Sequence, residues 1–389
     1  MRVHVFGNVL NNAVVLAREL ERAGVEARVF LPVDRLGIAG DAPEWEYGEA
    51  GVPAHLIEGL PAVRLLTPSN LSFVRRFVRG ADLLHVFGVG PALLASHLGK
   101  LPPVVFHSYG GDLQWIPWNR RTVALRVYAF MQRRGIRRAD AAIIQPYQWP
   151  FVRRLRYEGI VHDDVPFLAD FENLTALPPD ERVAAEYGSY RLVVYSPTRH
   201  AYDTHHDIGL YAKNNYVAID GFSRFVKESG VAPSEACLVM VDKGPNVEDS
   251  RALIRREGIE PYVKLIPEHP KAVVYSFLRL PNVVVADQFP RVTLTIGGIA
   301  REALAFGCPL ITRADIPATA RQYHTDTVPL LYAETPEQIA AHLRAMLDDR
   351  AREQHRQAAR RWADVHLRDN RLLVERLLDI YAALLGGRA

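Results

Sequence analysis

The segment between residues 283 and 312 contains residue types suited to holding a ligand. An apolar run, 283–286, leads into a loop that ends at Gly297 and Gly298, and Glu302 follows in the first turns of a predicted helix. Glycines let backbone N–H groups approach a ligand, and a helix N-terminus carries partial positive charge. A carboxylate there can accept hydrogen bonds from sugar hydroxyls. The combination suits an anionic, hydroxyl-rich ligand such as a nucleotide sugar; glycines that serve packing alone are the alternative.

Basic residues follow other apolar runs in the same half of the chain. Arg199 comes after the predicted strand 192–195, Lys213 opens a predicted helix, and Lys243 follows the predicted strand 237–241. Cations near strand ends can neutralise a departing diphosphate. The sequence therefore predicts an anion subsite at Arg199, Lys213 and Lys243, with solvated surface charge as the alternative for any one of them.

His107 is the candidate for chemistry in the first half of the chain. It ends the predicted strand 104–107 and is followed by Gly110, Gly111 and Asp112. An imidazole at a strand end can hydrogen-bond a sugar hydroxyl or a phosphate, or assist proton transfer. The other interpretation is a histidine that only holds the loop, with Asp112 capping the next turn.

Strands and helices alternate along the chain, which predicts an α/β protein with doubly wound parallel sheets. A chain of 389 residues favours two domains. We expect the domains to span 1–175 and 176–369, and a final helix at 370–389. The strands are expected at 2–6, 27–31, 83–87, 104–107 and 141–145, and then at 192–195, 237–241, 263–266, 283–286 and 310–312. Ligands of such sheets bind beyond the carboxyl ends of the strands.

Several classes of function are disfavoured by the sequence. The loop after the first predicted strand, 7–12, is not G-x-G-x-x-G, which argues against a dinucleotide oxidoreductase. The histidines and aspartates of 200–209 match no familiar metal spacing, so no metal site is expected. The two cysteines suggest no disulfide framework, and the N-terminus resembles a strand rather than a signal peptide. The cysteine usage makes a cytoplasmic protein the expectation. No run of about 18 apolar residues is present, so no membrane-spanning segment is expected.

The region between Trp115 and Ile160 is strongly basic. It holds ten arginines against Asp140 and Glu158, whereas the whole chain has a net charge of only +3. One interpretation is peripheral docking on the anionic inner face of a membrane, helped by aromatic residues of the same region. A helix with a solvated basic face is the other. No nucleic-acid-binding motif accompanies the charge, so a nucleic-acid partner is not expected.

The order of these motifs resembles the GT-B glycosyltransferases, most closely the retaining family four that includes sucrose synthases and phosphatidylinositol mannosyltransferases. The matching segments are 82–86, 107–112, 196–199 with Lys213, and 297–309. The resemblance implies two Rossmann-like domains with a cleft between them, an acceptor domain first and a nucleotide-sugar domain second. It also implies that the last helix crosses back to the first domain.

The resemblance implies roles for the candidate residues. Arg199 and Lys213 would bind the donor diphosphate, Glu302 the ribose hydroxyls, and the backbone at Gly297 and Gly298 would face the donor sugar. His107 would approach the reacting hexose. The implied activity is metal-independent transfer of a sugar, with retention, from a nucleoside diphosphate to a hydroxyl of a glycan, a lipid-linked acceptor or a small molecule, with no cofactor besides the donor.

One departure from the family pattern leaves alternatives open. Leu294 occupies the position where the family usually has the first of two glutamates, with seven residues between it and the second, Glu302. The missing carboxylate normally meets a donor-sugar hydroxyl. A non-hydrolysing UDP-sugar 2-epimerase and a catalytically inactive sugar-nucleotide-binding protein are therefore the alternatives.

Overall fold

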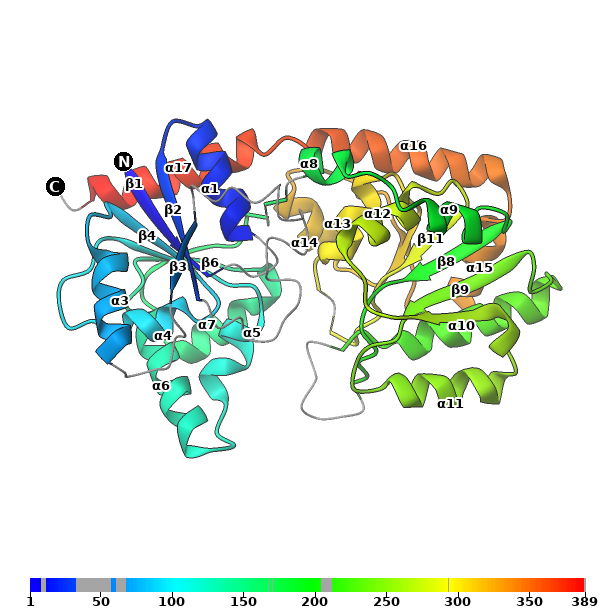
Figure 1. Ribbon diagram of the computed structural model, residues 1–389, viewed down its shortest axis with the longest axis horizontal. Coiled ribbons are helices and arrows are strands. Elements are labelled where there is room, and N and C mark those ends of the chain that lie inside the picture. The colour runs from blue at the N-terminus through cyan, green and yellow to red at the C-terminus, as the bar shows by residue number, and fades with distance from the viewer. Residues whose placement is uncertain are drawn as a thin grey trace. The chain divides into compact units, whose positions relative to one another are not determined.

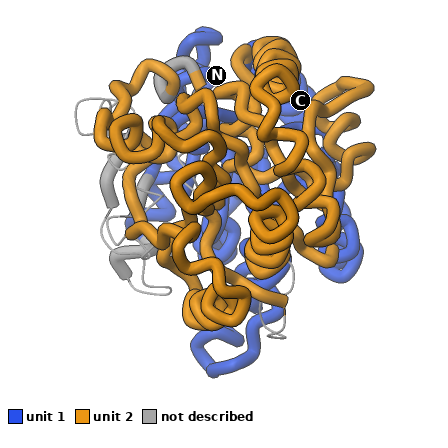
Figure 2. The backbone as a smooth tube through the Cα atoms, turned by 90° about the vertical axis from the view of Figure 1, so that its right-hand side faces the viewer, with its two compact units in different colours: residues 1–170, 370–389 blue, residues 171–369 orange. Residues whose placement is uncertain are grey.

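The computed structural model describes residues 1–7, 12–32, 57–60, 68–166, 168–169, 171–203, 212–292 and 294–387. The chain divides into two compact units (Figure 2). Unit 1 consists of Met1–Asp170 together with Asn370–Ala389, and unit 2 consists of Phe171–Asp369. The last twenty residues therefore belong to the same unit as the first residues of the chain.

Unit 1 is built on a parallel sheet with helices on its faces (Figure 1). Among the described residues the strand order is β3-β2-β1-β4-β5-β6-β7. The strands are β1 (Arg2–Phe6), β2 (Glu26–Pro32), β3 (Ile57–Leu60), β4 (Leu83–Phe87), β5 (Val104–His107), β6 (Ala141–Ile143) and β7 (Ile160–His162). The helices are α1 (Asn12–Arg22), α3 (Pro68–Val78), α4 (Gly90–Leu94), α5 (Gly111–Gln114), α6 (Val123–Arg137), α7 (Trp149–Leu155) and α17 (Arg371–Gly386).

Unit 2 has a second parallel sheet, with the described strands in the order β10-β9-β8-β11-β12-β13. The strands are β8 (Leu192–Ser196), β9 (Ala236–Val241), β10 (Val263–Ile266), β11 (Val283–Ala286), β12 (Leu310–Thr312) and β13 (Leu331–Tyr332). The helices are α8 (Phe171–Ala176), α9 (Glu181–Tyr187), α10 (Asn215–Ser229), α11 (Val247–Glu257), α12 (Lys271–Arg279), α13 (Gly298–Ala305), α14 (Ile316–Gln322), α15 (Pro336–Ala345) and α16 (Asp349–His366).

Both sheets contain the Rossmann strand order, in which successive strands are added first on one side of the first strand and then on its other side. The switch point lies between β1 and β4 in unit 1 and between β8 and β11 in unit 2. The strands are apolar because helices cover both faces of each sheet; all six residues of β9, for example, are buried. The fold class expected from the sequence is thus confirmed, and each switch point marks where a ligand is expected.

The C-terminal helix α17 packs back on unit 1, where Val374, Leu377 and Tyr381 join the core that also contains residues of β1 and α1. In Figure 1 it runs beside α1. Two polar contacts fix the return of the chain: Asn370 Nδ2 donates to the Ala169 carbonyl at 2.9 Å, and Arg376 pairs with Asp164. The expected return of the last helix is part of the confirmed fold.

Helix α6 is held tightly against α4 through a glycine. A Cβ on Gly135 would lie 1.8 Å from the Pro91 carbonyl oxygen, so only glycine allows this approach of the two helices. Gln132, one turn earlier, is fully buried; its side chain accepts from Ala92 N and donates to the Gly88 and Asp112 carbonyls. The inner face of α6 is therefore fixed to two loops at the carboxyl edge of the sheet.

Some elements were not expected from the sequence. Strands β3, β7 and β13 are present in addition to the predicted strands. Strand β13 has two residues and β7 has three, none of which is fully buried, so both are too short for an apolar pattern to reveal them. The predicted strand 141–145 ends at Ile143, since Gln145 N is taken by the Gln148 side chain in a capping box.

Candidate functional site

The candidate site of unit 2 lies at the carboxyl ends of β8 and β11, which flank the switch point. Asp287 and Gln288 directly follow β11, and the Thr198 hydroxyl after β8 donates to the Asp287 carbonyl at 3.1 Å. Lys213 reaches the same place from the start of α10: its Nζ donates to Gln288 Oε1 at 2.5 Å, and its carbonyl accepts from Phe289 N. The two strand ends and Lys213 thus form one cluster.

Charge is concentrated in this cluster. Burial raises the pKa of Asp287 to about 6. The charge of Glu302 also raises this pKa, whereas the charge of Lys213 lowers it. Burial also lowers the pKa of Lys213, with Asp287 opposing the change and Arg199 adding to it. These couplings place Arg199, Lys213, Asp287 and Glu302 within electrostatic reach of one another. Arg199 itself is exposed.

Two carboxylate oxygens in the cluster are buried and have no hydrogen-bond partner, namely Asp287 Oδ2 and Glu302 Oε2. The other oxygen of Glu302 accepts from Lys271 Nζ of α12. Buried polar atoms are nearly always paired, and an unpaired one in a native structure commonly marks the place of a ligand or a water. The cluster therefore has acceptor capacity for hydroxyl or amide hydrogens.

Gly297 and Gly298 stand at the N-terminus of α13, beside the two carboxylates. A Cβ on Gly297 would lie 3.7 Å from Asp287 Oδ2, and a Cβ on Gly298 would meet no atom within 4 Å. Gly297 has φ −82°, which any residue can adopt. Protein packing therefore does not require glycine at either position, which disfavours the packing explanation and leaves open space beside the first N–H groups of the helix.

Leu294 lies in the loop between β11 and α13 and is 7% exposed. Its carbonyl accepts from Asp315 N at 2.8 Å. The side chain at this position therefore contributes apolar surface where the family pattern has a carboxylate.

Lys243 is placed differently from the other predicted cations. Its side chain is 45% exposed and pairs with Glu268, whereas its carbonyl accepts from His200 N. The close approach of His200 requires glycine at the following position: Gly244 has φ +125°, and a Cβ there would lie 2.3 Å from the His200 carbonyl oxygen. Among the residues that the structure describes, no contact joins the Lys243 side chain to the cluster.

The histidine- and aspartate-containing segment falls partly outside the described residues, which exclude 204–211. Of its described members, His200 is buried and its Nδ1 is 2.5 Å from Ser250 Oγ, while Asp203 pairs with Arg291. In the part of the chain that the structure describes, no group of three or more His, Cys, Asp or Glu residues is arranged to hold a metal ion.

In unit 1, His107 is the end of a buried chain of hydrogen bonds. Its Nδ1 lies 3.3 Å from Nε2 of His85 in β4, and Nδ1 of His85 lies 2.6 Å from the Tyr381 hydroxyl of α17. Burial lowers the pKa of His107 to about 3, and burial together with His107 lowers that of His85 well below its usual range. Both imidazoles are therefore neutral near pH 7, so each ring has one nitrogen that donates a hydrogen bond and one that accepts.

The loop after His107 is folded around Asp112. This carboxylate accepts from the Ser108 hydroxyl at 2.8 Å and from the backbone N–H groups of Tyr109, Gly110 and Leu113. Burial nevertheless raises the pKa of Asp112 to about 6. Asp112 therefore holds the loop in its conformation, whereas the His107 ring is positioned by its own contact with His85.

Sequence reasoning did not single out four residues of these clusters. Asp287 and Gln288 directly follow a predicted strand, which is a usable signal because ligands bind at strand ends. Lys271 and Tyr381 lie within helices far away in sequence, and nothing in their local pattern indicates contact with Glu302 or His85.

Comparison with known proteins supports the fold. Residues 12–146, which include His85, His107 and α6, match the family model described as a glycosyl transferase 4-like domain. None of the curated protein sequences matches the chain.

The structure of Anabaena HepE in complex with UDP is similar with a TM-score of 0.67 at 15% identity, covering 98% of this chain and 100% of that one. Sucrose-phosphate synthase from Thermosynechococcus elongatus gives 0.66 at 13% identity and 100% of both chains. A glycosyltransferase from Rickettsia africae gives 0.65 at 13% identity, covering 99% of this chain and 98% of that one. The chain therefore has the two-domain α/β GT-B fold of these structures, and its residues 12–146 are similar to the glycosyl transferase 4-like domain.

Proposed function

We propose that the chain is a glycosyltransferase that moves a sugar from a nucleoside diphosphate donor to an acceptor hydroxyl. The observation that carries the proposal is the cluster of Lys213, Asp287, Gly297 and Glu302 at the switch point of unit 2. It combines a cation, the N–H groups of a helix N-terminus and carboxylate oxygens with spare acceptor capacity. A nucleotide sugar presents complementary phosphates and hydroxyls in one molecule.

In this proposal Arg199 and Lys213 bind the donor diphosphate. When the bond between the sugar C1 and the phosphate oxygen breaks, negative charge grows on that oxygen, and cations already in place stabilise it. Lys213 is suited to this role because Gln288 and the backbone of Phe289 fix its position. Since two cations and a helix N-terminus supply the positive charge, we propose that the reaction needs no metal ion.

Glu302 is proposed to hold the ribose. Its Oε2 atom is buried and unpartnered, and Lys271 fixes the other oxygen, so one acceptor remains for a hydroxyl. Gly297 and Gly298 leave the backbone accessible, and we place the donor sugar and phosphates against it. Lys243 is proposed to add positive charge near the donor.

His107 of unit 1 is proposed to hydrogen-bond the reacting hexose. The new bond between C1 and the acceptor oxygen forms on the face from which the diphosphate leaves, and the acceptor proton passes to the departing phosphate oxygen. This route retains the configuration at C1. Retention is proposed from the resemblance to family four.

The comparisons suggest the first donor to test. Anabaena HepE has been solved with UDP, with UDP and glucose, and with UDP-glucose, and an alpha-glucosyltransferase has been solved with UDP-glucose and DNA. UDP-glucose is therefore the first choice, followed by GDP-, ADP- and dTDP-sugars. The acceptor is to be found with a panel of glycans, lipid-linked acceptors and small molecules.

The test measures release of UDP with and without acceptors, alongside thermal shifts with each donor. We expect acceptor-dependent release and a donor-specific stabilisation, both lost in Glu302→Ala and Arg199→Ala. Formation of an epimer without acceptor would instead identify a 2-epimerase. Donor binding without turnover across the whole panel would identify an inactive binding protein, for which Leu294 is the specific reason.

A further inference from the structure

Helix α6 and the segment before it present a basic face that the proposed transfer reaction does not use. Between residues 119 and 138 the chain has seven arginines and no acidic residue. They are Arg120, Arg121, Arg126, Arg133, Arg134, Arg137 and Arg138. We call this surface the α6 face.

The α6 face also exposes apolar side chains. Val123 is 75% exposed, Val127 42% and Phe130 53%, and these positions share one side of the helix because they are spaced by four and three residues. Trp115, in the segment just before, is 44% exposed. An apolar stripe with cations along its length is the composition of a helix that lies in a membrane interface.

Five arginines of the α6 face have no counter-charge in the part of the chain that the structure describes. Arg120, Arg126, Arg133, Arg134 and Arg137 form no ion pair with a described acidic side chain; Arg126, Arg133 and Arg137 donate to backbone carbonyls instead. Burial lowers the pKa of Arg133, and the charges of Arg120, Arg137 and Arg154 lower it further. The guanidinium groups therefore repel one another, and an anion between them would relieve this repulsion.

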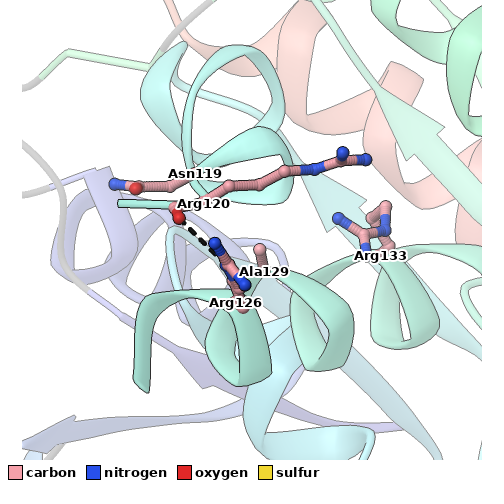
Figure 3. Close-up of a pocket in the computed structure, with 5 residues that line it drawn as sticks. All are labelled: Asn119, Arg120, Arg126, Ala129 and Arg133. Atoms are coloured by element: carbon pink, nitrogen blue, oxygen red, sulfur yellow. Dashed lines mark hydrogen bonds between the residues drawn. The ribbon is translucent and has the colours of Figure 1, made fainter. Parts of the chain in front are cut away.

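Two hollows give the arginines room to surround an anionic group. One has a volume of about 400 Å³ and is lined by Asn119, Arg120, Arg126, Ala129 and Arg133. In Figure 3, Arg126 and Arg133 extend from α6 toward the segment that carries Arg120, whose side chain runs above the helix. The second, of about 390 Å³, is lined by Phe130, Arg133, Arg134, Arg137 and Arg138. Arginine suits this role because its planar fork matches phosphate oxygens.

We propose that the α6 face docks on a bilayer that contains anionic phospholipids, with headgroup phosphates among the arginines and Phe130, Val127 and Val123 at the acyl boundary. Such a surface satisfies both parts of the face. A free phosphate or a nucleic acid would pair with the arginines but leave the apolar stripe in water. A neutral bilayer would offer no net negative charge to the arginines.

The inner side of α6 keeps the helix in place during docking. Gln132 and Gly135 tie it to α4 and to two loops of the unit, so only the outer side is available. Docking therefore needs no unfolding of the helix. In the part of the chain that the structure describes, no helix is long and apolar enough to cross a membrane.

Vesicle flotation of the full chain tests the proposal. We expect the protein to float with vesicles of phosphatidylcholine mixed with phosphatidylglycerol, but not with phosphatidylcholine alone, and binding to weaken as salt rises. The variant Arg120→Glu/Arg134→Glu changes two side chains that form no hydrogen bond with another described residue. It should bind at least about 25-fold more weakly, because each arginine near an anionic surface contributes about fivefold. Phe130→Ser should weaken binding at unchanged charge.

Matched variants on unit 2 control for total charge and for apolar exposure. Arg255→Glu/Arg350→Glu makes the same charge change at two exposed positions, and Val365→Ser removes a comparably exposed apolar side chain. Both should bind like the unchanged protein. Equal flotation with neutral vesicles, no flotation at all, or full binding by Arg120→Glu/Arg134→Glu would each overturn the proposal. The proposal is supported if binding is weakened in Phe130→Ser and in Arg120→Glu/Arg134→Glu but not in the two control variants. This result does not depend on whether the chain transfers a sugar.

Discussion

The hydroxyl of Tyr381 lies 2.6 Å from Nδ1 of His85, although the two residues are 296 positions apart in sequence. His85 in turn lies 3.3 Å from His107, the predicted catalytic group of unit 1. Burial raises the pKa of Tyr381, so the hydroxyl keeps its proton. If it donates to His85, then His85 donates to Nδ1 of His107, and Nε2 of His107 carries the hydrogen. The C-terminal helix can thereby set which nitrogen of His107 donates.

The variant Tyr381→Phe removes the first bond of this chain. We expect a loss of about 1–3 kcal/mol in the free energy of unfolding, because a buried imidazole nitrogen loses its partner. We also expect the tautomer populations of His107 to change, which ¹⁵N NMR of labelled histidine reports. The control is Tyr157→Phe, which removes a hydrogen bond to the Ala139 carbonyl elsewhere in the unit. A tautomer change in both variants, or in neither, would contradict the role of Tyr381.

The buried histidines predict how stability depends on pH. The pKa of His107 falls from 6.5 to about 3 on folding, and that of His85 is also lowered. The unfolded chain therefore binds protons below pH 6.5 that the folded chain does not, and stability decreases as the pH falls from 6.5. In His107→Gln the slope of stability against pH should be smaller by up to about 1.4 kcal/mol per pH unit between about pH 4 and 6. Urea unfolding at several pH values measures this slope. The exposed His324, changed to Gln, should leave it near that of the unchanged protein.

For Asp287 we expect stability to change with pH in the opposite direction. Its pKa rises from 3.8 to about 6 on folding, so the folded chain keeps a proton that the unfolded chain has lost, and stability decreases as the pH rises from about 4 to 6. Asp287→Asn carries no charge at any pH and should gain stability relative to the unchanged protein over that range, by about 3 kcal/mol at most. Thermal unfolding at pH values on both sides of the range would detect the gain. Asp326→Asn, at an exposed position, should show none, and a constant difference for Asp287→Asn would mean that its pKa is not raised.

Replacing Gly135 should cause a packing defect that does not involve charge. In Gly135→Ala the new methyl group would overlap the Pro91 carbonyl, so α4 and α6 must separate. We expect a loss of about 1–3 kcal/mol, or more if the helices cannot adjust. Gly386→Ala, where no atom lies within 4 Å of the added carbon, should unfold at nearly the same denaturant concentration as the unchanged protein. An equally small effect at Gly135 would show that the contact between the helices is loose.

The fold was predictable where strands are apolar and long enough to show it. Runs such as those of β4, β5 and β11 are buried along their whole length, so burial dictates their sequence. The edge strand β13 has two residues and β7 is only partly buried, so pairing with a neighbour rather than local pattern creates them. The return of α17 was expected from the family resemblance and not from the residues of the helix.

The candidate site was predictable only as far as local chemistry shows in sequence. Gly297, Gly298 and Glu302 stand out because a glycine pair follows a buried strand and an acid lies five residues further on in the helix. Lys271 and Tyr381 could not be found, since their roles come from tertiary contacts with Glu302 and His85. Whether Lys243 belongs to the donor site stays a prediction, because its side chain pairs with Glu268 at the surface.

The central claim is that the cluster at the switch point of unit 2 binds a nucleotide sugar, and calorimetric titration of UDP-glucose into the full chain tests it most directly. We predict measurable binding that becomes about 10- to 100-fold weaker in Lys213→Met, because a charge-assisted hydrogen bond to phosphate contributes about 1.5–3 kcal/mol. Lys264→Met, at an exposed position of β10, should bind like the unchanged protein. GDP-, ADP- and dTDP-glucose serve as further donors. Binding of none of them, or equal binding to the unchanged protein and to Lys213→Met, would contradict the account.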